Sequence, residues 1–401
     1  MVVAACVEAE DMANEGDWCA ALKSAPVIVD DADARWLQRL KLTAILQHQS
    51  AHVDGVDRNG RDFHNTTSEL RRFWIGADAK FFDVLGLNVL DQMSNDRSNY
   101  PGGELELGHE TFQSAHATLD LKRLADLEAL DLLELGYGRR IVRMAHEFQT
   151  SCYLIDTLER SSFATKFWPC DEEGGGALGA WVKSGIGDAT LDVALLSGTY
   201  DDYIGGWSGD SKMLYAAFQN TRTDQAGLDA VQWWLSGFYQ WDEEPGKDSL
   251  GFGAEWAGLA STMLVRGPWE VRGSVGVGGN GEQGNPEREG YFAGLVFQPM
   301  VWLIEDRLKL VFRYQLLASG AAEGIRLNSR YLRVAEADAG GLIDLNGGYG
   351  DRNHNAYLGL VIPLCDDKLK VLVGTEYDDL SSNGETMTRG WTTSASLRVW
   401  F

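Results

Sequence analysis

Basic residues gather in one segment of the chain and have the chemistry needed to hold an anion. Residues 132–170 contain Arg139, Arg140, Arg143, Arg160 and Lys166 but only four acids, so the segment has a charge of +1 in a chain of net charge -24. Guanidinium and ammonium groups make charge-assisted hydrogen bonds that replace the water an anion loses. A pore selects solutes at its narrowest point, so these five residues are candidates for an anion-attracting constriction.

Strand phase places six more cations on the inner face of a barrel: Arg72, Lys80, Lys309, Arg313, Lys370 and Arg398. Of these, Arg72, Lys80 and Arg313 are our candidate pore-lining residues. Two interpretations stay open for all the cations. They either line a pore and attract anions, or they are ordinary strand-end and wall charges. In the second case Glu159 pairs with Arg160 or a neighbour, and Asp78 and Glu376 neutralise the wall.

Motifs for catalysis or nucleotide binding are weak. Residues 276–281 match G-x-G-x-x-G, but Pro286 follows closely and no helix can begin there to receive a phosphate. The seven His include no H-E-x-x-H helix. Acid pairs such as Asp201–Asp202 fall in predicted loops, where they hold calcium loosely at most, and no Ser–His pairing suggests a nucleophile. We expect no enzyme activity, no cofactor and no dedicated metal site.

The last eleven residues show which element positions such side chains. One face carries Trp391, Thr393, Ala395, Leu397, Val399 and Phe401, and the other carries Thr392, Ser394, Ser396, Arg398 and Trp400. A period of two predicts a β-strand. Soluble chains usually end in a polar tail, because terminal residues gain little from ordering. A strand that stops at an aromatic residue in the middle of an apolar face is typical of bacterial outer-membrane β-barrels.

Alternating segments recur along the chain. We predict strands over roughly residues 35–48, 68–82, 84–92, 111–122, 132–144, 176–187, 189–197, 211–220, 228–241, 250–262, 269–279, 289–300, 307–319, 354–364, 368–378 and 390–401. That is sixteen, an even number, as in bacterial single-chain barrels. The expected fold is therefore all-β: a transmembrane antiparallel β-barrel of about sixteen strands, with short periplasmic turns and long extracellular loops.

The connections between these strands alternate in length. Long polar loops are predicted at 49–67, 93–110, 145–175, 198–210, 320–353 and 379–389. Tight links are predicted at Asp83, Gly187–Asp188, Arg266–Pro268, Glu305–Asp306 and Asp366–Asp367. A β-sandwich has no reason to alternate in this way, whereas barrel loops do. The 320–353 loop is long enough to hold extra strand-like structure between Arg326 and Val334.

Composition agrees with a barrel and excludes other classes. There is no run of 18 apolar residues, so no transmembrane helix is expected. The mean hydropathy of -0.22 fits strands that alternate lipid-facing with lumen-facing residues. The 14 Trp lie mostly near strand ends, as interfacial belts require, and Trp233–Trp234 puts one ring on each face. A net charge of -24 argues against nucleic acid partners.

Residues 1–34 differ from the rest of the chain, with eight acids and one base, Lys23. We interpret them as an acidic periplasmic or disordered extension with one short helix at most, and residues 35–401 as the barrel. No secretory signal is visible in the given numbering. Cys152 and Cys170 flank one predicted loop, so they either form a disulfide or remain reduced thiols.

Three stretches carry a resemblance to the phosphate-selective porin O/P family of outer-membrane porins. They are residues 133–163 with Glu159-Arg160-Ser161, residues 71–82, and the final hairpin 355–377. The resemblance covers roughly residues 35–401. It implies a sixteen-stranded barrel, commonly a homotrimer, that passes anions through a constriction lined by Arg and Lys.

The chain departs from that family in two ways. Met144-Ala145-His146 replaces a Pro-Phe-Gly-like element, and the net charge is strongly negative. We expect a bacterial outer-membrane porin for small hydrophilic solutes, favouring anions such as phosphate, in contact with membrane lipid and lipopolysaccharide. The alternative is a structural or adhesive barrel plugged by the 145–175 and 320–353 loops. A third class is a soluble all-β carbohydrate-binding protein.

Overall fold

The structure is a computed structural model that describes residues 16–24, 26–94, 105–169, 176–197, 212–225, 227–241, 254–281, 285–327 and 329–401. Its strands are β1 (Val27–Asp30), β2 (Leu37–Asp57), β3 (Asp62–Phe81), β4 (Leu85–Ser94), β5 (Leu107–Asp120), β6 (Leu132–Arg140), β7 (Ala177–Ile186), β8 (Ala189–Ser197), β9 (Lys212–Gln225), β10 (Leu228–Trp241), β11 (Ala254–Arg266), β12 (Trp269–Asn280), β13 (Gly290–Ile304), β14 (Leu308–Ser319), β15 (Ile325–Arg326), β16 (Tyr349–Gly350), β17 (Arg352–Cys365), β18 (Leu369–Ser382) and β19 (Glu385–Trp400). Its helices are α1 (Gly16–Ser24), α2 (Leu121–Leu124), α3 (His146–Gln149), α4 (Ser162–Lys166), α5 (Arg330–Asp338) and the 3-10 turn η2 (Asn346–Gly348). No helix in this part of the chain is long and apolar enough to cross a membrane.

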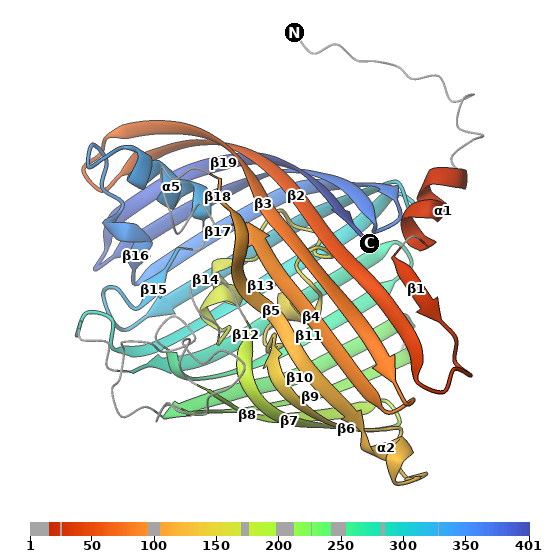
Figure 1. Ribbon diagram of the computed structural model, residues 1–401. Coiled ribbons are helices and arrows are strands. Elements are labelled where there is room, and N and C mark those ends of the chain that lie inside the picture. The colour runs from red at the N-terminus through yellow and green to blue at the C-terminus, as the bar shows by residue number, and fades with distance from the viewer. Residues whose placement is uncertain are drawn as a thin grey trace.

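Sixteen strands close into one antiparallel barrel, as the alternation predicts (Figure 1). Each strand from β2 to β14 pairs with the next, β14 pairs with β17, and β17, β18 and β19 follow in order. The barrel closes where β19 pairs with β2, from Trp400 opposite Ile45 to Thr388 opposite Asp57. Closure removes both free edges of the sheet, so every barrel strand has a partner on each side.

The two faces of the last strand are as predicted. Leu397 is 43% exposed on the outer surface, whereas Arg398 is 1% exposed and points inward. Large exposed apolar side chains occur on the outer face of most strands, including Leu46, Ile75, Val89, Val182, Leu235, Val275, Phe297, Phe312, Leu358 and Val373. A band of this kind requires an apolar surrounding, which a lipid bilayer supplies.

Connections differ between the two ends of the barrel, which we call the short-turn rim and the long-loop rim. At all five predicted tight links a residue has positive φ: Asp83, Gly187, Gly267, Asp306 and Asp366. Two predicted long loops are wrong. Residues 49–57 and 62–67 belong to β2 and β3, and the β18–β19 connection is only 383–384. These hairpins continue beyond the apolar outer band. There the outward residues are polar, as in a loop, while apolar residues such as Val53 and Leu380 face inward.

The described part of the N-terminal segment lies at the short-turn rim beside the C-terminus (Figure 1). β1 pairs with β2 through Val27 opposite Lys41, next to where β19 ends. A disulfide joins Cys19 of α1 to Cys365, at the end of β17. Of the two alternatives for Cys152 and Cys170, the structure favours the reduced form, because Cys152 is a buried free thiol; Cys170 lies outside the described residues. Cysteines 346 positions apart gave no spacing signal in the sequence.

Candidate functional site

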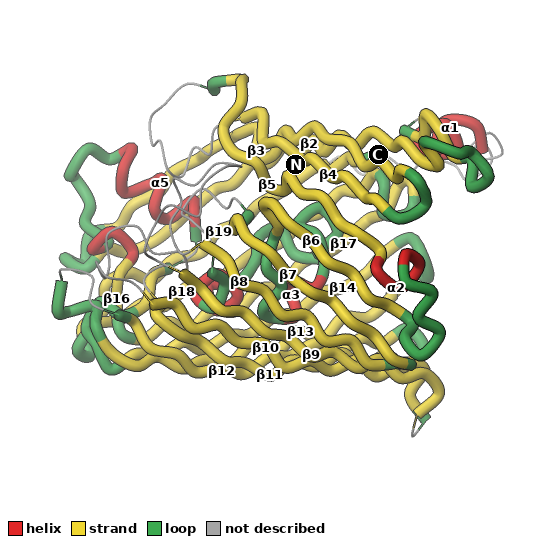
Figure 2. Tube along the Cα trace, turned by 60° about the horizontal axis from the view of Figure 1, so that its bottom comes forward, coloured by secondary structure: helices red, strands yellow, loops and turns green. Residues whose placement is uncertain are grey.

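Residues 141–169, which we call the lumen insert, leave β6 and fold into the barrel. They carry α3 and α4, and Figures 1 and 2 show this segment surrounded by strands. Met144, Ala145, Phe163 and Phe167 are completely buried, although a loop of this length would normally lie on the surface. Residues 145–169, the described part of the 145–175 loop that was predicted as a constriction, therefore lie inside the lumen.

One side of the insert packs on an apolar wall formed by β7 to β13. Phe167 lies 5.1 Å from Phe292 between ring centres. A Cβ on Gly276 would come within 2.6 Å of the Phe167 ring, and a Cβ on Gly294 within 2.9 Å of Phe163. Gly276 belongs to the G-x-G-x-x-G match, and its function here is to leave room for an aromatic ring.

Hydrogen bonds fix the beginning of the insert to the same wall. The Tyr215 hydroxyl donates to the carbonyl of Arg143 at 2.8 Å, and Trp234 Nε1 donates to the carbonyl of Met144 at 3.3 Å. His146 Nδ1 lies 2.9 Å from Ser274 Oγ. Burial lowers the pKa of His146 to about 4, so the ring is neutral at pH 7. Trp233 and Trp234 lie on opposite faces of the barrel wall, as predicted, and Trp234 is the one that faces inward.

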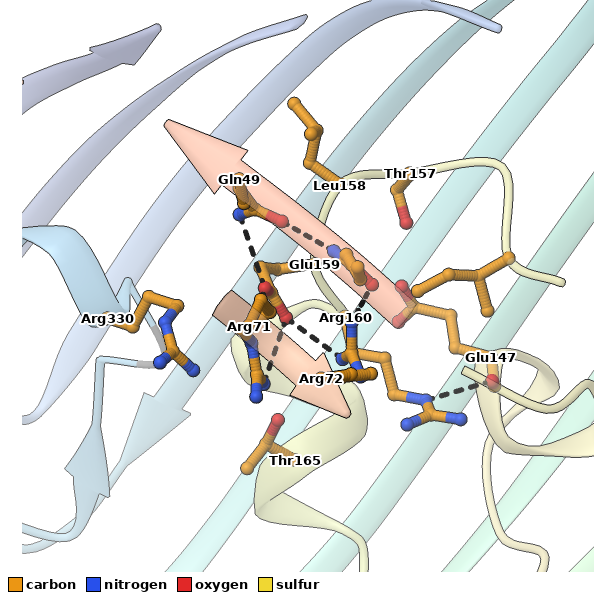
Figure 3. A network of polar contacts seen from close by, with 12 residues as sticks. Gln49, Arg71, Arg72, Glu147, Thr157, Leu158, Glu159, Arg160, Thr165 and Arg330 are labelled. Atoms are coloured by element: carbon orange, nitrogen blue, oxygen red, sulfur yellow. Dashed lines mark hydrogen bonds and ion pairs between the residues drawn. The ribbon is translucent and has the colours of Figure 1, made fainter. Parts of the chain in front are cut away.

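The other side of the insert meets a charged wall, which we define as the inward side chains of β2, β3, β14, β17, β18 and β19. Glu159 Oε1 accepts from Arg71 Nε at 2.8 Å, and Glu159 Oε2 accepts from Arg72 Nη2 at 3.3 Å (Figure 3). Gln49 Nε2 adds a bond of 3.3 Å. Burial alone would raise the pKa of Glu159, but Arg71 and Arg72 outweigh it and hold that pKa well below its usual range.

Two more carboxylates of the insert contact cations of the charged wall. Glu147 Oε1 accepts from Arg313 Nη1 at 2.8 Å, and Asp156 Oδ2 lies 3.2 Å from Lys309 Nζ. Burial raises the pKa of both acids, yet Arg313 and Lys309 respectively lower it by more, so both values lie below the ordinary range. All three acids are therefore ionised at neutral pH and hold the insert to the wall.

Backbone carbonyls of the insert accept hydrogen bonds from two more buried cations of the charged wall, Arg398 and Lys370. Arg398 donates to the carbonyls of Ile155, Thr157 and Leu158 at 2.6–2.8 Å, and Lys370 Nζ donates to that of Ile155 at 3.3 Å. Arg398 and Lys370 do face the lumen, as strand phase predicts. They bind the insert rather than an open aqueous space.

The structure does not bring the eight candidate cations together. Arg139 donates to the carbonyl of Gly176, and Arg140 forms an ion pair with Asp192 at 2.9 Å. Lys80 pairs with Asp83 at the short-turn rim, 2.8 Å apart.

The other candidates lie in or against the insert. Arg160 donates to the carbonyls of Glu147 and Thr150, so the predicted Glu159–Arg160 pairing is replaced by Glu159 with Arg71 and Arg72. Lys166 Nζ donates to Asn280 Oδ1 at 2.6 Å, and burial lowers the pKa of Lys166 to about 7. Arg72 and Arg313 are pairing partners of the insert. Arg143 alone of the eight has an exposed side chain with no partner among the described residues.

Sequence reasoning missed the acids that organise this site. Glu147 and Asp156 carried no signal, because their partners lie on β14, more than 150 positions away. Arg71 was overlooked because the β2–β3 pairing shifts register between Gln47 and His48, which upsets strict alternation. The described residues hold no cluster of three or more His, Cys, Asp or Glu placed to bind a metal.

A second insert enters from the long-loop rim. The strand-like structure predicted between Arg326 and Val334 is limited to β15, where Arg326 pairs with Tyr349 of β16, and helix α5 follows it. Its Arg330 pairs with Glu69 of β3 at 2.9 Å, and the Tyr331 hydroxyl donates to the same carboxylate at 2.9 Å. A cavity of about 20 Å³ separates α5 from Glu159 and Arg160. That volume holds water rather than a solute.

Solved structures of outer-membrane channels have the same fold. An anion-selective porin from Comamonas acidovorans matches with a TM-score of 0.55 and 9% identity, over 90% of this chain and 99% of that one. The channel DcaP of Acinetobacter baumannii matches with 0.53 and 11% identity, over 90% and 97%. OmpT of Vibrio cholerae matches with 0.51 and 9%, over 90% and 98%. No protein-family model and no curated protein sequence matches the chain. These likenesses show that the chain has the fold of an outer-membrane porin barrel.

Proposed function

We propose that this protein is an outer-membrane porin that lets small hydrophilic solutes diffuse through a lumen narrowed by residues 141–169. The observation that carries the proposal is a closed barrel with an apolar outer band and an inward-folded segment held by the ion pairs of three acids. Such a segment sets the width of a pore without performing chemistry. No nucleophile or cofactor has a part in this proposal.

We also propose that the channel prefers anions to cations, with phosphate among its solutes. This preference is supported by Arg143, which has an exposed side chain and whose carbonyl accepts a hydrogen bond from Tyr215 of the apolar wall. The other candidate cations are neutralised by acids or held by carbonyl and amide oxygens, so we expect the preference to be modest. The resemblance to phosphate-selective porins and the fold of the anion-selective porin point in the same direction.

Reversal potentials in a KCl gradient across planar bilayers test the proposal. We expect discrete conductance steps with chloride more permeant than potassium, and Arg143→Glu should shift the reversal potential toward cation selectivity. Arg123→Glu, on the exposed turn at α2, is the matched control. Cation selectivity of the natural protein would contradict the anion proposal. The absence of any conductance would contradict the porin proposal.

A plugged structural barrel remains the second candidate function. The observation that favours it is the presence of two inserts, residues 141–169 and α5, which line one small cavity together. Deleting the α5 segment distinguishes the two. A porin should conduct before and after the deletion, whereas a plugged barrel should conduct only after it.

We also propose that the barrel contacts membrane lipid and lipopolysaccharide and forms a homotrimer. The apolar outer band suits lipid, and the acidic chain suits divalent cations bridging to lipopolysaccharide. The family resemblance adds a homotrimer. Native mass spectrometry from detergent would show the protomer number and any retained lipid, and a monomer free of lipopolysaccharide would contradict both expectations.

A further inference from the structure

Asp378 is a buried acid of the charged wall with no cation beside it. It lies on the inward face of β18 and is 1% exposed. Among the described residues, no Lys, Arg or His nitrogen forms an ion pair with its carboxylate. Glu69, Glu147 and Glu159 by contrast each contact an arginine.

Amide groups hold this carboxylate in place without neutralising it. Asn355 Nδ2 donates to Asp378 Oδ1 at 2.8 Å and to Glu376 Oε1 at 2.5 Å, so one amide bridges two acids. Glu376 also accepts from Arg313, at 3.1 Å, and Arg313 is shared with Glu147. Three carboxylates share one guanidinium here, so their ionised forms give this part of the wall a charge of -2.

Three buried oxygen atoms in this part of the wall have no hydrogen-bond partner: Asp378 Oδ2, Asn355 Oδ1 and Thr392 Oγ1. The strand register makes their residues neighbours. Asp378 lies opposite Asn355 on β17 and opposite Gly390 on β19. Thr392, two residues further along β19, lies opposite Glu376.

Leaving these oxygens bare would be costly. An unpaired carboxylate in a water-poor site loses its hydration with no compensating charge. Leu332 of α5 would lie 3.1 Å from a Cβ on Gly390, so the helix covers this part of the wall with an apolar side chain. Glu376 and Thr392 also line the small cavity below α5, which gives a ligand room beside these oxygens.

We propose that Asp378, Glu376 and Asn355, with the hydroxyl of Thr392, bind a hard divalent cation of the calcium class. Carboxylate, amide and hydroxyl oxygens are the ligands that such ions prefer. One divalent ion balances the charge of -2, which a monovalent ion does not. The ion ties β17, β18 and β19 together beneath α5, and its binding is independent of whether the channel conducts.

Thermal unfolding of the full chain in detergent tests the proposal. The protein is stripped with EDTA in choline chloride, and CaCl2 or NaCl is then added. We expect CaCl2 to raise the unfolding temperature by about 5 °C, with a smaller effect of NaCl. Asp378→Asn should abolish the calcium response. Asp379→Asn is the matched control, because the adjacent Asp379 faces outward and pairs with Arg389.

The same measurement can overturn the site. An equal calcium response in Asp378→Asn would mean that the ion acts on acidic loops elsewhere. An absent response in the natural protein, or an equal response to NaCl, would also contradict a divalent site. If Asp378→Asn does not fold, Thr392→Val removes one ligand while keeping every charge. It should shift the calcium midpoint to higher concentration, and an unchanged midpoint would again contradict the proposal.

Discussion

At the scale of single residues, the central feature is that the insert supplies the counter-ions of the wall. Glu159 is the clearest case, since it contacts Arg71, Arg72 and Gln49 at once (Figure 3). The wall cations are therefore occupied by carboxylates that belong to the chain itself. An anionic solute can use Arg72 or Arg313 only where it displaces one of these acids.

Glu159→Gln should loosen the insert. The substitution removes the carboxylate that Arg71 and Arg72 share in a nearly buried position, at a cost of about 3 kcal/mol. We expect a larger and noisier single-channel conductance and faster protease cleavage within residues 150–160. Glu289→Gln, an exposed rim acid, is the control. Identical conductance and cleavage in the two variants would show that the ion pairs do not hold the insert.

Acid should release the insert in two stages. The folded state disfavours protonation of His146, whose pKa is about 4, so its contribution to stability falls as pH drops from about 6.5 toward 4. The lowered pKa values of Glu147, Asp156 and Glu159 keep their contribution intact until pH falls below the ordinary carboxyl range of about 4. Conductance and protease sensitivity measured from pH 7 to 3 should rise over both windows. A flat profile would contradict the ion-pair account.

At the scale of elements, the insert is held by shape on one side and by charge on the other. Glycines on β12 and β13 leave hollows for Phe167 and Phe163. Strand glycines usually weaken a sheet, so their presence here is explained by the rings that they admit. On the charged wall opposite, Gly359 and Gly374 make room for Tyr357 of the wall itself, and paired ions hold the insert.

Gly276→Ala should displace α4 from the apolar wall. The added Cβ would lie 2.6 Å from the Phe167 ring, and such overpacking costs about 1–3 kcal/mol. We expect a lower unfolding temperature and an altered conductance. Gly258→Ala is a close control on the neighbouring strand β11, where nothing lies within 4 Å of the new Cβ. Equal effects of the two changes would contradict the packing argument.

At the scale of the whole molecule, local patterns predict the barrel and fail at its interior. Leu397 and Arg398 could be assigned to opposite faces because alternation is a property of adjacent residues. The pairing of Glu159 with Arg71 could not be assigned, since the two lie 88 positions apart and meet only after the barrel closes. The same holds for α5, whose Arg330 finds Glu69 across 261 positions.

The Cys19–Cys365 bond has a consequence for the order in which the protein is made. Its second sulfur lies at the end of β17, so the bond cannot form until nearly the whole polypeptide has been delivered. The bond joins elements on the two sides of the seam between β19 and β2, so we expect it to form when the seam is in place. The oxidised thiol pair is thus a chemical record of completed assembly. In pulse-chase labelling with an alkylating reagent, we expect Cys19 to stay reactive in chains stalled before β17. Its protection should coincide with the appearance of the compact, heat-modifiable species.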